Sequence, residues 1–377
     1  MQENSLRFCA VRGDAADPLI ARRHPELAHA YRSAFQRDRD RVVHTRAFRR
    51  LAGKTQVFTH PESDHFRSRL THTIEVAQIA RTVADALGLN EDLAEVLALV
   101  HDIGHPPFGH AGEQALNEQL QQYGLRFDHN LHALRIVEHF EQRYVSFRGL
   151  NLTLGVREGI IKHSRDHSAA EHPELAEYML DGYPPLEAQI IDMADEIAYL
   201  TADIDDGIDA GILSLEQIGR EVSLFAECYR PLALRHPDAT PKLLFHESLK
   251  SMMNALIGDL IVNTRRQVLD ANIHSLQDVR NYGERLAAFS PAMEERRSQA
   301  KLYLSEHLYH AEELERDHAL ADEIISSLFV YWMRCPDRLP AAHEIQIATE
   351  GAPRVVADYI AGMTDHYITQ QWQKGRL

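Results

Sequence analysis

The chain carries a histidine followed directly by an aspartate, His101-Asp102, with a further histidine upstream at His72. A carboxylate further along, Asp195, would complete a set of two imidazoles and two carboxylates. Such a set suits Mg, Mn, Fe, Co, Ni or Zn, because it combines borderline nitrogen with hard oxygen donors and lacks a soft thiolate. A metal held there would polarise a phosphoryl oxygen and lower the pKa of a bound water molecule, which supplies a nucleophile at neutral pH.

A histidine on the apolar side of a helix is more often a hydrogen-bonded core residue than a ligand, and this alternative applies to His72. Two carboxylates favour the metal site. Asp102 closes an apolar stretch, where a charged group is costly unless it is paired or bound to metal. Asp195 lies in another apolar helical stretch. We therefore predict four metal ligands: His72, His101, Asp102 and Asp195.

A second group of residues has the spacing of an acid–base pair. His110 and Glu113 are at positions i and i+3, so that in a helix the carboxylate lies one turn from the imidazole. Such a carboxylate orients the ring and raises its pKa, and the histidine can then give or take a proton near neutral pH. His129 is a candidate partner. We predict catalytic roles for these three residues and leave the direction of proton transfer by His110 open.

Three residues around the last predicted ligand share one helix face. Asp195, Tyr199 and Asp203 fall at i, i+4 and i+8. Asp195 would reach the metal, while the tyrosine ring and the second carboxylate would line a pocket above it. The alternative, a solvated acidic face, fits the acidic run at residues 205–209 better than it fits these three.

Helices must position these side chains. An apolar stripe over residues 72–83 predicts one helix with His72 on its buried side. Asn90 is an N-cap for the next helix, whose segment Leu93–Val100 is apolar on nearly every side and predicts burial. A glycine and a Pro-Pro pair end this helix just beyond the His-Asp pair, which is therefore expected in its last turn.

Helical periodicity dominates the remaining sequence, which contains no series of strands alternating with helices. Further helices are predicted near 112–123, 129–146, 155–163, 186–205, 215–230, 242–269, 278–289, 300–314, 319–334 and 353–371. A short hairpin is predicted over Val145–Leu154. We therefore expect an all-α protein that forms a single domain, 1–377, with a catalytic core at about 45–210 and a helical C-terminal extension at about 211–377.

Composition indicates a globular protein of a reducing compartment. The three cysteines are widely spaced and odd in number, which fits the cytoplasm and no disulfide framework. No basic-then-apolar leader opens the chain, and its longest strongly apolar stretch is far too short to span a bilayer. We therefore expect a cytoplasmic protein that has no membrane partner.

The net charge of −16 is unevenly distributed, because residues 1–70 carry +6 and the remainder carries −22. An acidic body disfavours general binding to nucleic acid, yet the basic N-terminal segment leaves room for a local polyanion site. Alternatively, five arginines of this segment only solvate helix faces: Arg22, Arg23, Arg37, Arg39 and Arg41.

The ordered motifs resemble the HD-domain phosphohydrolase superfamily, whose signature of a histidine, a His-Asp pair and a later aspartate matches His72, His101-Asp102 and Asp195. Longer strings are similar to the deoxyguanosinetriphosphate triphosphohydrolase (dGTPase) family, in its shorter bacterial dGTPase-like branch. These strings are Arg49–Phe58, Arg67–Val76, His101–Glu113, Glu158–His163, Ala194–Asp203 and Asp358–Asp365.

The resemblance implies an HD-domain helical core with additional C-terminal helices. It also implies hydrolysis of dGTP or several dNTPs to deoxynucleoside and tripolyphosphate, by attack of water on the α-phosphorus and departure of the 5′-oxygen. A divalent metal at the predicted ligands and the catalytic residues His110, Glu113 and His129 agree with this family. A homo-oligomer and a second nucleotide acting as an allosteric activator are further implications.

The resemblance also assigns substrate contacts, position by position. Gln56 would meet the sugar 3′ edge, and the Tyr199 ring would pack on the deoxyribose and exclude a 2′-hydroxyl. The remaining contacts, to phosphate or sugar, are Arg69, His105, Asn130, Lys162 and Asp203. Arg69 lies one turn before His72 on the same predicted helix, where a guanidinium can meet a triphosphate.

Two departures from the family limit this transfer. Glu196 stands where a dNTPase relative has a phosphate-contacting lysine, so that this contact is missing. The chain is also shorter than the dGTP-specific enterobacterial relatives, whose extra segments contribute to base recognition and to binding of nucleic acid such as single-stranded DNA. The base preference therefore stays open.

Two alternative functions remain. One is an HD phosphohydrolase that acts on another nucleotide, a mononucleotide or a diester; the absence of a lysine directly after residues 101–104 argues against the binuclear class that carries one there. The other is a non-catalytic dNTP sensor, or a partner of single-stranded DNA. The complete ligand set, the His110–Glu113 pair and the net charge of −16 argue against this second alternative.

Overall fold

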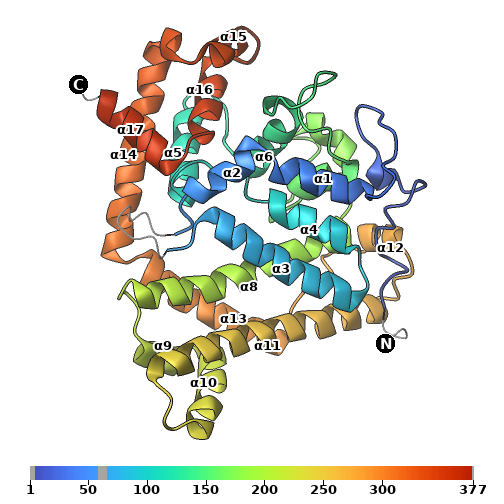
Figure 1. Ribbon diagram of the computed structural model, residues 1–377, viewed down its shortest axis with the longest axis vertical. Coiled ribbons are helices and arrows are strands. Elements are labelled where there is room, and N and C mark those ends of the chain that lie inside the picture. The colour runs from blue at the N-terminus through green and yellow to red at the C-terminus, as the bar shows by residue number, and fades with distance from the viewer. Residues whose placement is uncertain (1–4, 58–65, 376–377) are drawn as a thin grey trace.

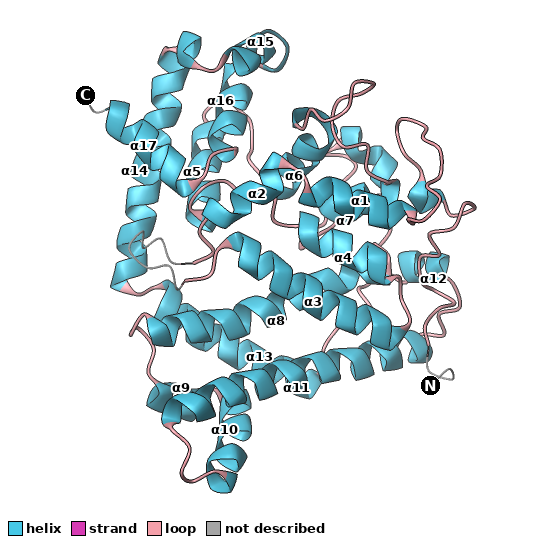
Figure 2. Cartoon of the chain, viewed as in Figure 1, coloured by secondary structure: helices cyan, strands magenta, loops and turns pink. Residues whose placement is uncertain are grey.

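The computed structural model describes residues 5–57 and 66–375, and in these ranges it contains helices and loops but no strand (Figure 2). The predicted all-α class is confirmed. The hairpin predicted over Val145–Leu154 is wrong, because Leu150 donates its backbone N–H to the Val137 carbonyl and Gly149 pairs with Gln142 in an isolated bridge. The loop therefore bonds back to the preceding helical segment. Phe58, the last residue of one family-like string, lies outside the described residues.

In the described residues, the first half of the chain forms eight helices and four short helical turns. The helices are α1 (Ala34–Val43), α2 (Arg46–Arg50), α3 (Arg69–Leu87), α4 (Glu91–Val100), α5 (Gly109–Gln121), α6 (His129–Arg135), α7 (Leu154–Ile161) and α8 (Leu186–Asp209). The short turns are η1 (Pro18–Ile20), η2 (Leu51–Gly53), η3 (Ile136–Phe140) and η4 (Pro173–Tyr178).

The second half continues with helices and two short turns. The helices are α9 (Leu215–Glu221), α10 (Ser223–Arg235), α11 (Pro241–Asp270), α12 (Leu276–Asn281), α13 (Pro291–Leu304), α14 (Glu312–Arg334), α15 (Ala341–Glu350), α16 (Ala352–Ala361) and α17 (Asp365–Gly375). The turns are η5 (Ser305–Tyr309) and η6 (Pro336–Arg338).

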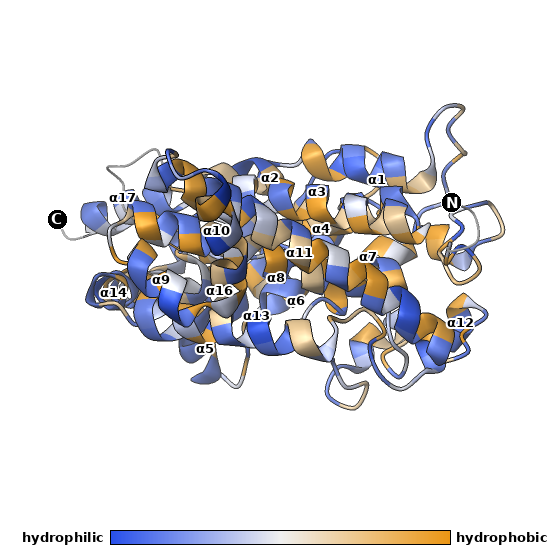
Figure 3. Cartoon of the chain, turned by 90° about the horizontal axis from the view of Figure 1, so that it is seen from below, coloured by the Kyte–Doolittle hydropathy of each residue, from blue (hydrophilic) through white to orange (hydrophobic). Residues whose placement is uncertain are grey.

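Helices α3, α4 and α8 form the centre of the molecule. The three pack against one another, α1 covers α4, and the long helix α11 crosses below α3 and α8 (Figure 1). Seen from below, hydrophobic residues gather along the middle of the molecule around α4, α8 and α11 (Figure 3). Burial of these apolar faces supplies the main driving force for the packing that brings the predicted ligands together.

Local sequence signals set the ends of the two helices that carry the first ligands. The Ser68 hydroxyl accepts the Thr71 N–H at the start of α3, and Gly88 ends α3 with φ of 74°. The Asn90 side chain accepts the Leu93 N–H and begins α4, as predicted. Helix α4 ends at Val100, so the His-Asp pair follows its last turn directly.

Five predicted helices are shorter or divided in the structure. The one expected over 300–314 falls on the end of α13, on η5 and on the start of α14, and the one expected over 353–371 is divided into α16 and α17. The helix expected over 129–146 ends in η3, and the one expected over 215–230 is divided at Val222, whose backbone is extended. The helix expected over 278–289 ends at Asn281. The Gln189 side chain accepts the N–H groups of Leu286 and Ala287, which replaces the helical bonds of that segment. Tertiary hydrogen bonds thus override the local periodicity.

The C-terminal helices form a second hydrophobic cluster together with α5. Ile325 and Phe329 of α14, and Ile360 of α16, pack with Leu116 and Leu120 of α5. The helix that carries two predicted catalytic residues is therefore held by the C-terminal extension. Among the described residues, none of the helices combines the length and apolar character needed to cross a bilayer.

Candidate active site

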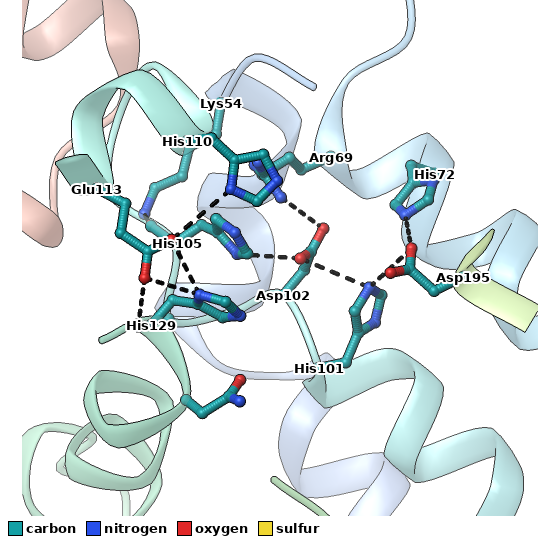
Figure 4. A network of polar contacts seen from close by, with 12 residues as sticks. Lys54, Arg69, His72, His101, Asp102, His105, His110, Glu113, His129 and Asp195 are labelled. Carbon is teal, nitrogen blue, oxygen red and sulfur yellow. Dashed lines mark hydrogen bonds and ion pairs between the residues drawn. The ribbon is translucent and has the colours of Figure 1, made fainter. Parts of the chain in front are cut away.

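The four predicted metal ligands converge from three helices. His72 comes from α3, His101 and Asp102 follow α4, and Asp195 comes from α8 (Figure 4). The His72 Nε2 atom lies 2.8 Å from Asp195 Oδ1, and His101 Nε2 lies 3.9 Å from the same oxygen. The Asp102 Oδ1 atom is 3.5 Å from His101 Nε2. These groups are positioned for a divalent metal.

The hydrogen bonding of His101 supports a cation at this point. Its Nδ1 atom donates to the Ala98 carbonyl at 2.6 Å, so that Nε2 carries the lone pair. This Nε2 atom is buried, and in the described part of the chain it has no hydrogen-bond partner. A lone pair that faces the oxygens of Asp102 and Asp195 is repelled unless a cation lies among them. The residues present therefore fit a divalent metal.

Neighbouring side chains keep both carboxylates ionised. Burial favours the neutral form of Asp102, but the Arg69 guanidinium, which donates to Asp102 Oδ2 at 2.9 Å, together with His101 and His105 holds the pKa well below its usual range. Burial also opposes ionisation of Asp195, yet its contact with His72 lowers the pKa of that carboxyl. Ionised carboxylates are the form that binds metal.

His105 connects the metal ligands to the acid–base residues. Its Nδ1 atom lies 3.0 Å from Asp102 Oδ1, and its ring stacks on His129 with centroids 4.0 Å apart. Burial, reinforced by the nearby Arg69, lowers the pKa of His105 well below its usual value. His105 is therefore neutral at physiological pH and can offer a ring nitrogen to substrate without repelling the metal.

Glu113 binds His129 more closely than it binds His110. Its Oε1 accepts His129 Nδ1–H at 2.9 Å and the His129 backbone N–H at 3.1 Å, whereas His110 Nδ1 lies 3.7 Å from Oε2. Burial opposes ionisation of Glu113, but its contacts with the two histidines lower the pKa of that carboxyl strongly. The predicted pair is thus a triad, with the His110 side chain 82% exposed at its open end (Figure 4).

The sugar-binding residues expected from the resemblance gather beyond the metal ligands. Burial raises the pKa of Asp203 to about 7, and the Tyr309 hydroxyl donates to its Oδ2 at 2.5 Å. Its Oδ1 and the Gln56 Oε1 are buried, and in the described ranges each is without a hydrogen-bond partner. Tyr199 stands between Asp195 and Asp203 on α8. Two oxygen acceptors therefore face the same space as this aromatic ring.

One cavity of about 530 Å³ joins these groups. Ten predicted site residues line it: Gln56, Arg69, His72, Asp102, His105, His110, His129, Asp195, Tyr199 and Asp203. His101 of the ligand set and Glu113 of the triad do not line the cavity. They contact residues that do, since His101 lies beside Asp102 and Glu113 binds His129. Metal ligands, acid–base groups and sugar-side residues thus share one space.

Two predicted substrate contacts are not brought to this cavity. The Lys162 ammonium is buried against Glu158 at 2.9 Å and donates to the carbonyls of Met179 and Gly182. The Asn130 amide donates to the His163 carbonyl at 2.7 Å. Both residues stabilise the wall of the site in this structure, and their assignment as substrate contacts stays an untested prediction.

The sequence reasoning missed other residues that line the cavity, among them His163, Arg165, Lys301 and Tyr309. His163 has its ring 5.2 Å from that of His101, and it ends one of the family-like strings, which was a usable signal. Arg165 donates to Asp128 at 2.6 Å beside the Glu113 carboxylate. The last two come from the C-terminal extension, where no local pattern marks them.

Lys301 also bears on the departure noted at Glu196. The Lys301 ammonium binds Glu196 at 2.9 Å and lies 5.8 Å from the centroid of the Tyr199 ring. Arg297 binds the same carboxylate at 2.9 Å. A basic side chain from α13 therefore stands beside the position where the dNTPase relative carries its lysine.

A second cavity, of about 870 Å³, lies between α2 and the helices α15 to α17. It is larger than the first, and none of the predicted site residues lines it. Its wall includes four arginines: Arg46, Arg49, Arg50 and Arg143. We assign the chemistry to the smaller cavity, because the candidate metal ligands and the acid–base triad are there.

Comparison with known proteins shows the family of the chain. The HD domain family matches residues 69–200, and the phosphohydrolase-associated domain matches residues 287–374. A deoxyguanosinetriphosphate triphosphohydrolase-like protein of Azoarcus sp. (strain BH72) is 48% identical over 352 residues, which cover 93% of this chain and 92% of the relative. Proteins of the same name from Geobacter sulfurreducens and Bordetella pertussis are 43% and 42% identical, over 98% and 96% of this chain and 93% and 94% of the relatives. The chain therefore belongs to the HD-domain phosphohydrolases, in the bacterial branch of deoxyguanosinetriphosphate triphosphohydrolase-like proteins.

Proposed function

We propose that this protein is a metal-dependent dNTP triphosphohydrolase, which converts dGTP or several dNTPs into deoxynucleoside and tripolyphosphate. The single observation that carries the proposal is the shared cavity, since three of the four candidate metal ligands, the acid–base histidines and the sugar-side residues line it. Its volume of about 530 Å³ falls in the usual range for ligand pockets. The printed name of the relatives supports the substrate class.

A divalent metal held by the four predicted ligands would polarise a phosphoryl oxygen and make a water molecule more acidic. The departing 5′-oxygen needs a proton donor, because an alkoxide is a poor leaving group, and His110 is the candidate residue to give or take a proton in the reaction. Glu113 stays ionised and orients the two histidines that flank it. The buried Arg69 guanidinium adds a fixed positive charge beside the triphosphate.

Tyr199 is proposed to exclude ribonucleotides. Its ring packs on the deoxyribose where a 2′-hydroxyl would project, so that Tyr199→Ala opens space for that group. We expect the ratio of kcat/KM for dGTP over GTP to fall by up to about 10²-fold, the discrimination that an apolar pocket achieves against an added hydroxyl. Tyr199→Phe keeps the ring and should keep the ratio. Unchanged selectivity in Tyr199→Ala would refute the role.

The reaction itself is tested by product identity. Each dNTP and NTP is incubated with the purified protein and Mg, Mn, Co, Fe, Ni or Zn, and the products are separated by ion-pair chromatography. We expect deoxynucleoside and intact tripolyphosphate in equal amounts. Pyrophosphate or single phosphates would replace the proposal with another nucleotide phosphohydrolase. Binding of dNTP without turnover under every metal would identify a sensor.

A second nucleotide as an activator is a further part of the proposal, and the arginine-lined cavity of about 870 Å³ supports it. Guanidinium groups suit phosphate, and the cavity is separate from the reacting centre. In the same panel, one dNTP should accelerate hydrolysis of another. If the hydrolysis rate of each dNTP is unaffected by every other nucleotide, the proposed activator site is wrong.

We also propose that residues 1–377 act as one unit in the cytoplasm, as a homo-oligomer. The core at 45–210 and the extension at 211–377 act together because Lys301 and Tyr309 of the extension line the cavity. The three cysteines are unpaired, which supports a reducing compartment. Light scattering of the purified protein measures the oligomeric state, and a monomer at all concentrations would contradict that part.

A further inference from the structure

Asp365, the first residue of α17, joins two loops of the candidate active site. Its Oδ2 atom accepts the Thr55 backbone N–H at 2.6 Å and also accepts the Thr55 hydroxyl. Its Oδ1 atom accepts the Phe108 backbone N–H at 3.0 Å. The two loops are 310 and 257 residues away in sequence. One carboxylate therefore holds three donors from distant parts of the chain.

The two residues that donate to this carboxylate, Thr55 and Phe108, each precede a residue of the candidate site in the sequence. Thr55 is followed directly by Gln56, which lines the cavity. Phe108 is followed by Gly109 and then by His110, the exposed end of the acid–base triad. The Asp365 side chain itself does not line the cavity among the described residues. It can therefore act on the reaction through position, without touching substrate.

The turn before His110 needs such support. Phe108 has φ of 62°, in the left-handed region that disfavours a side chain, and Gly109 follows with φ of 58°. The N-cap residue Phe108 makes no side-chain cap bond at the start of α5, and the Asp365 carboxylate instead holds this turn by accepting the Phe108 N–H. Gly109 is required as well, because a Cβ there would lie 2.9 Å from the Arg69 guanidinium. Strained backbone persists only where the surroundings determine it.

Lys54 ties the same elements together a second time. Its buried ammonium donates to the Ala361 carbonyl at 2.9 Å and to the His105 carbonyl. Burial lowers the pKa of Lys54 to about 7. The end of α16 and the start of α17 are thus bound to the Gln56 loop and to the turn that carries His105 and His110.

We propose that Asp365 is a positioning residue that sets the placement of His110 relative to Gln56, so that the C-terminal helix α17 aligns the acid–base group with the sugar-side contact. The inference rests on the proposed function for its kinetic consequence. The loop geometry on which it depends is independent of any reaction.

The test replaces one acceptor oxygen of Asp365 and keeps the shape of the side chain. In Asp365→Asn, one oxygen becomes an NH2 group, which cannot accept from whichever loop it faces, so one of the two backbone amides loses its partner. Hydrogen exchange read out at Phe108 and Thr55 should become faster for at least one of them. Since misplacement of a catalytic group by about 1 Å costs about 10²-fold, kcat should fall by up to that factor.

Asp259 offers a matched control on α11. Its carboxylate accepts the Ser290 backbone N–H and the Ser290 hydroxyl, each at 2.7 Å, and therefore repeats the Asp365–Thr55 contact away from the cavity. Asp259→Asn should lower the melting temperature like any lost cap and leave kcat and KM unchanged. The milder Thr55→Val removes the hydroxyl bond alone and should reduce kcat/KM in the same direction as Asp365→Asn, by a smaller factor.

The outcomes separate the inference from the proposed function. If the wild-type protein hydrolyses no dNTP, the proposed function fails, while exchange at Phe108 and Thr55 still decides the contact. If both amides exchange as in wild type, or if kcat falls no further than in Asp259→Asn, Asp365 is not a positioning residue. If Asp365→Asn does not fold, an unchanged kcat/KM in Thr55→Val overturns the inference.

Discussion

Replacing Asp195 by alanine is expected to remove the bound divalent metal and the hydrolytic activity together. Its Oδ1 atom lies 2.8 Å from His72 Nε2 and 3.9 Å from His101 Nε2, so it faces two of the other predicted ligands. Loss of this carboxylate removes a negatively charged oxygen donor from a buried site, and the remaining donors include only one carboxylate, Asp102. Affinity for a hard or borderline cation should therefore fall below the level at which the purified protein retains metal.

The measurement combines elemental analysis of the dialysed protein with the product assay. Asp209, exposed near the end of the same helix, provides a matched control, and Asp209→Ala should retain both metal and activity. Asp102→Ala should behave like Asp195→Ala. Metal retained at wild-type stoichiometry in both ligand variants would overturn the assignment, even if activity were lost.

Replacing His110 by alanine is expected to leave the metal in place while lowering kcat by about 10²–10⁴-fold, the usual contribution of a general acid–base residue. The His110 side chain is 82% exposed and its Nδ1 lies 3.7 Å from Glu113 Oε2, away from the four candidate ligands. Glu113→Gln should also slow the reaction, because the Glu113 carboxylate orients both His110 and His129.

Steady-state kinetics and elemental analysis together measure this effect. Gln114 is exposed and directly follows Glu113 on α5. Gln114→Ala therefore controls for disturbance of the helix and should keep kcat. The acid–base role is wrong if His110→Ala keeps a rate close to that of wild type. Loss of metal in the same variant would instead move His110 into the ligand set.

Much of the local structure could be predicted from the sequence because it depends on neighbouring residues. The apolar stripe that contains His72, the N-cap at Asn90 and the apolar segment of α4 all determine helices within a few turns of themselves. The His-Asp pair then follows α4 directly. The ligand set was likewise visible as donor chemistry, since two imidazoles and two carboxylates suit a divalent metal wherever the fold unites them. The domain boundary near residue 210 stays a prediction.

The partners of the predicted catalytic residues were decided by the tertiary structure. The spacing of His110 and Glu113 predicted one pair, but packing of α6 against the turn after α4 brings His129 closer to that carboxylate. In this structure the Lys162 ammonium binds the buried Glu158, a partner that the resemblance did not indicate, and its assignment as a phosphate contact stays a prediction. The spacing of residues in a helix determines which of them share a face. It does not predict which distant part of the chain packs against that face.

Sequence by itself thus determined the all-α class and the main helices of the core, and it supplied a candidate donor set for a divalent metal, because these follow from periodicity, caps and ligand chemistry. Tertiary structure alone decided which side chains complete the cavity. Tyr309 meets Asp203 across 106 residues, and Asp365 meets Thr55 across 310. Such contacts arise when whole helices bury their apolar faces against one another. A local sequence pattern does not predict where a helix from the far end of the chain will pack.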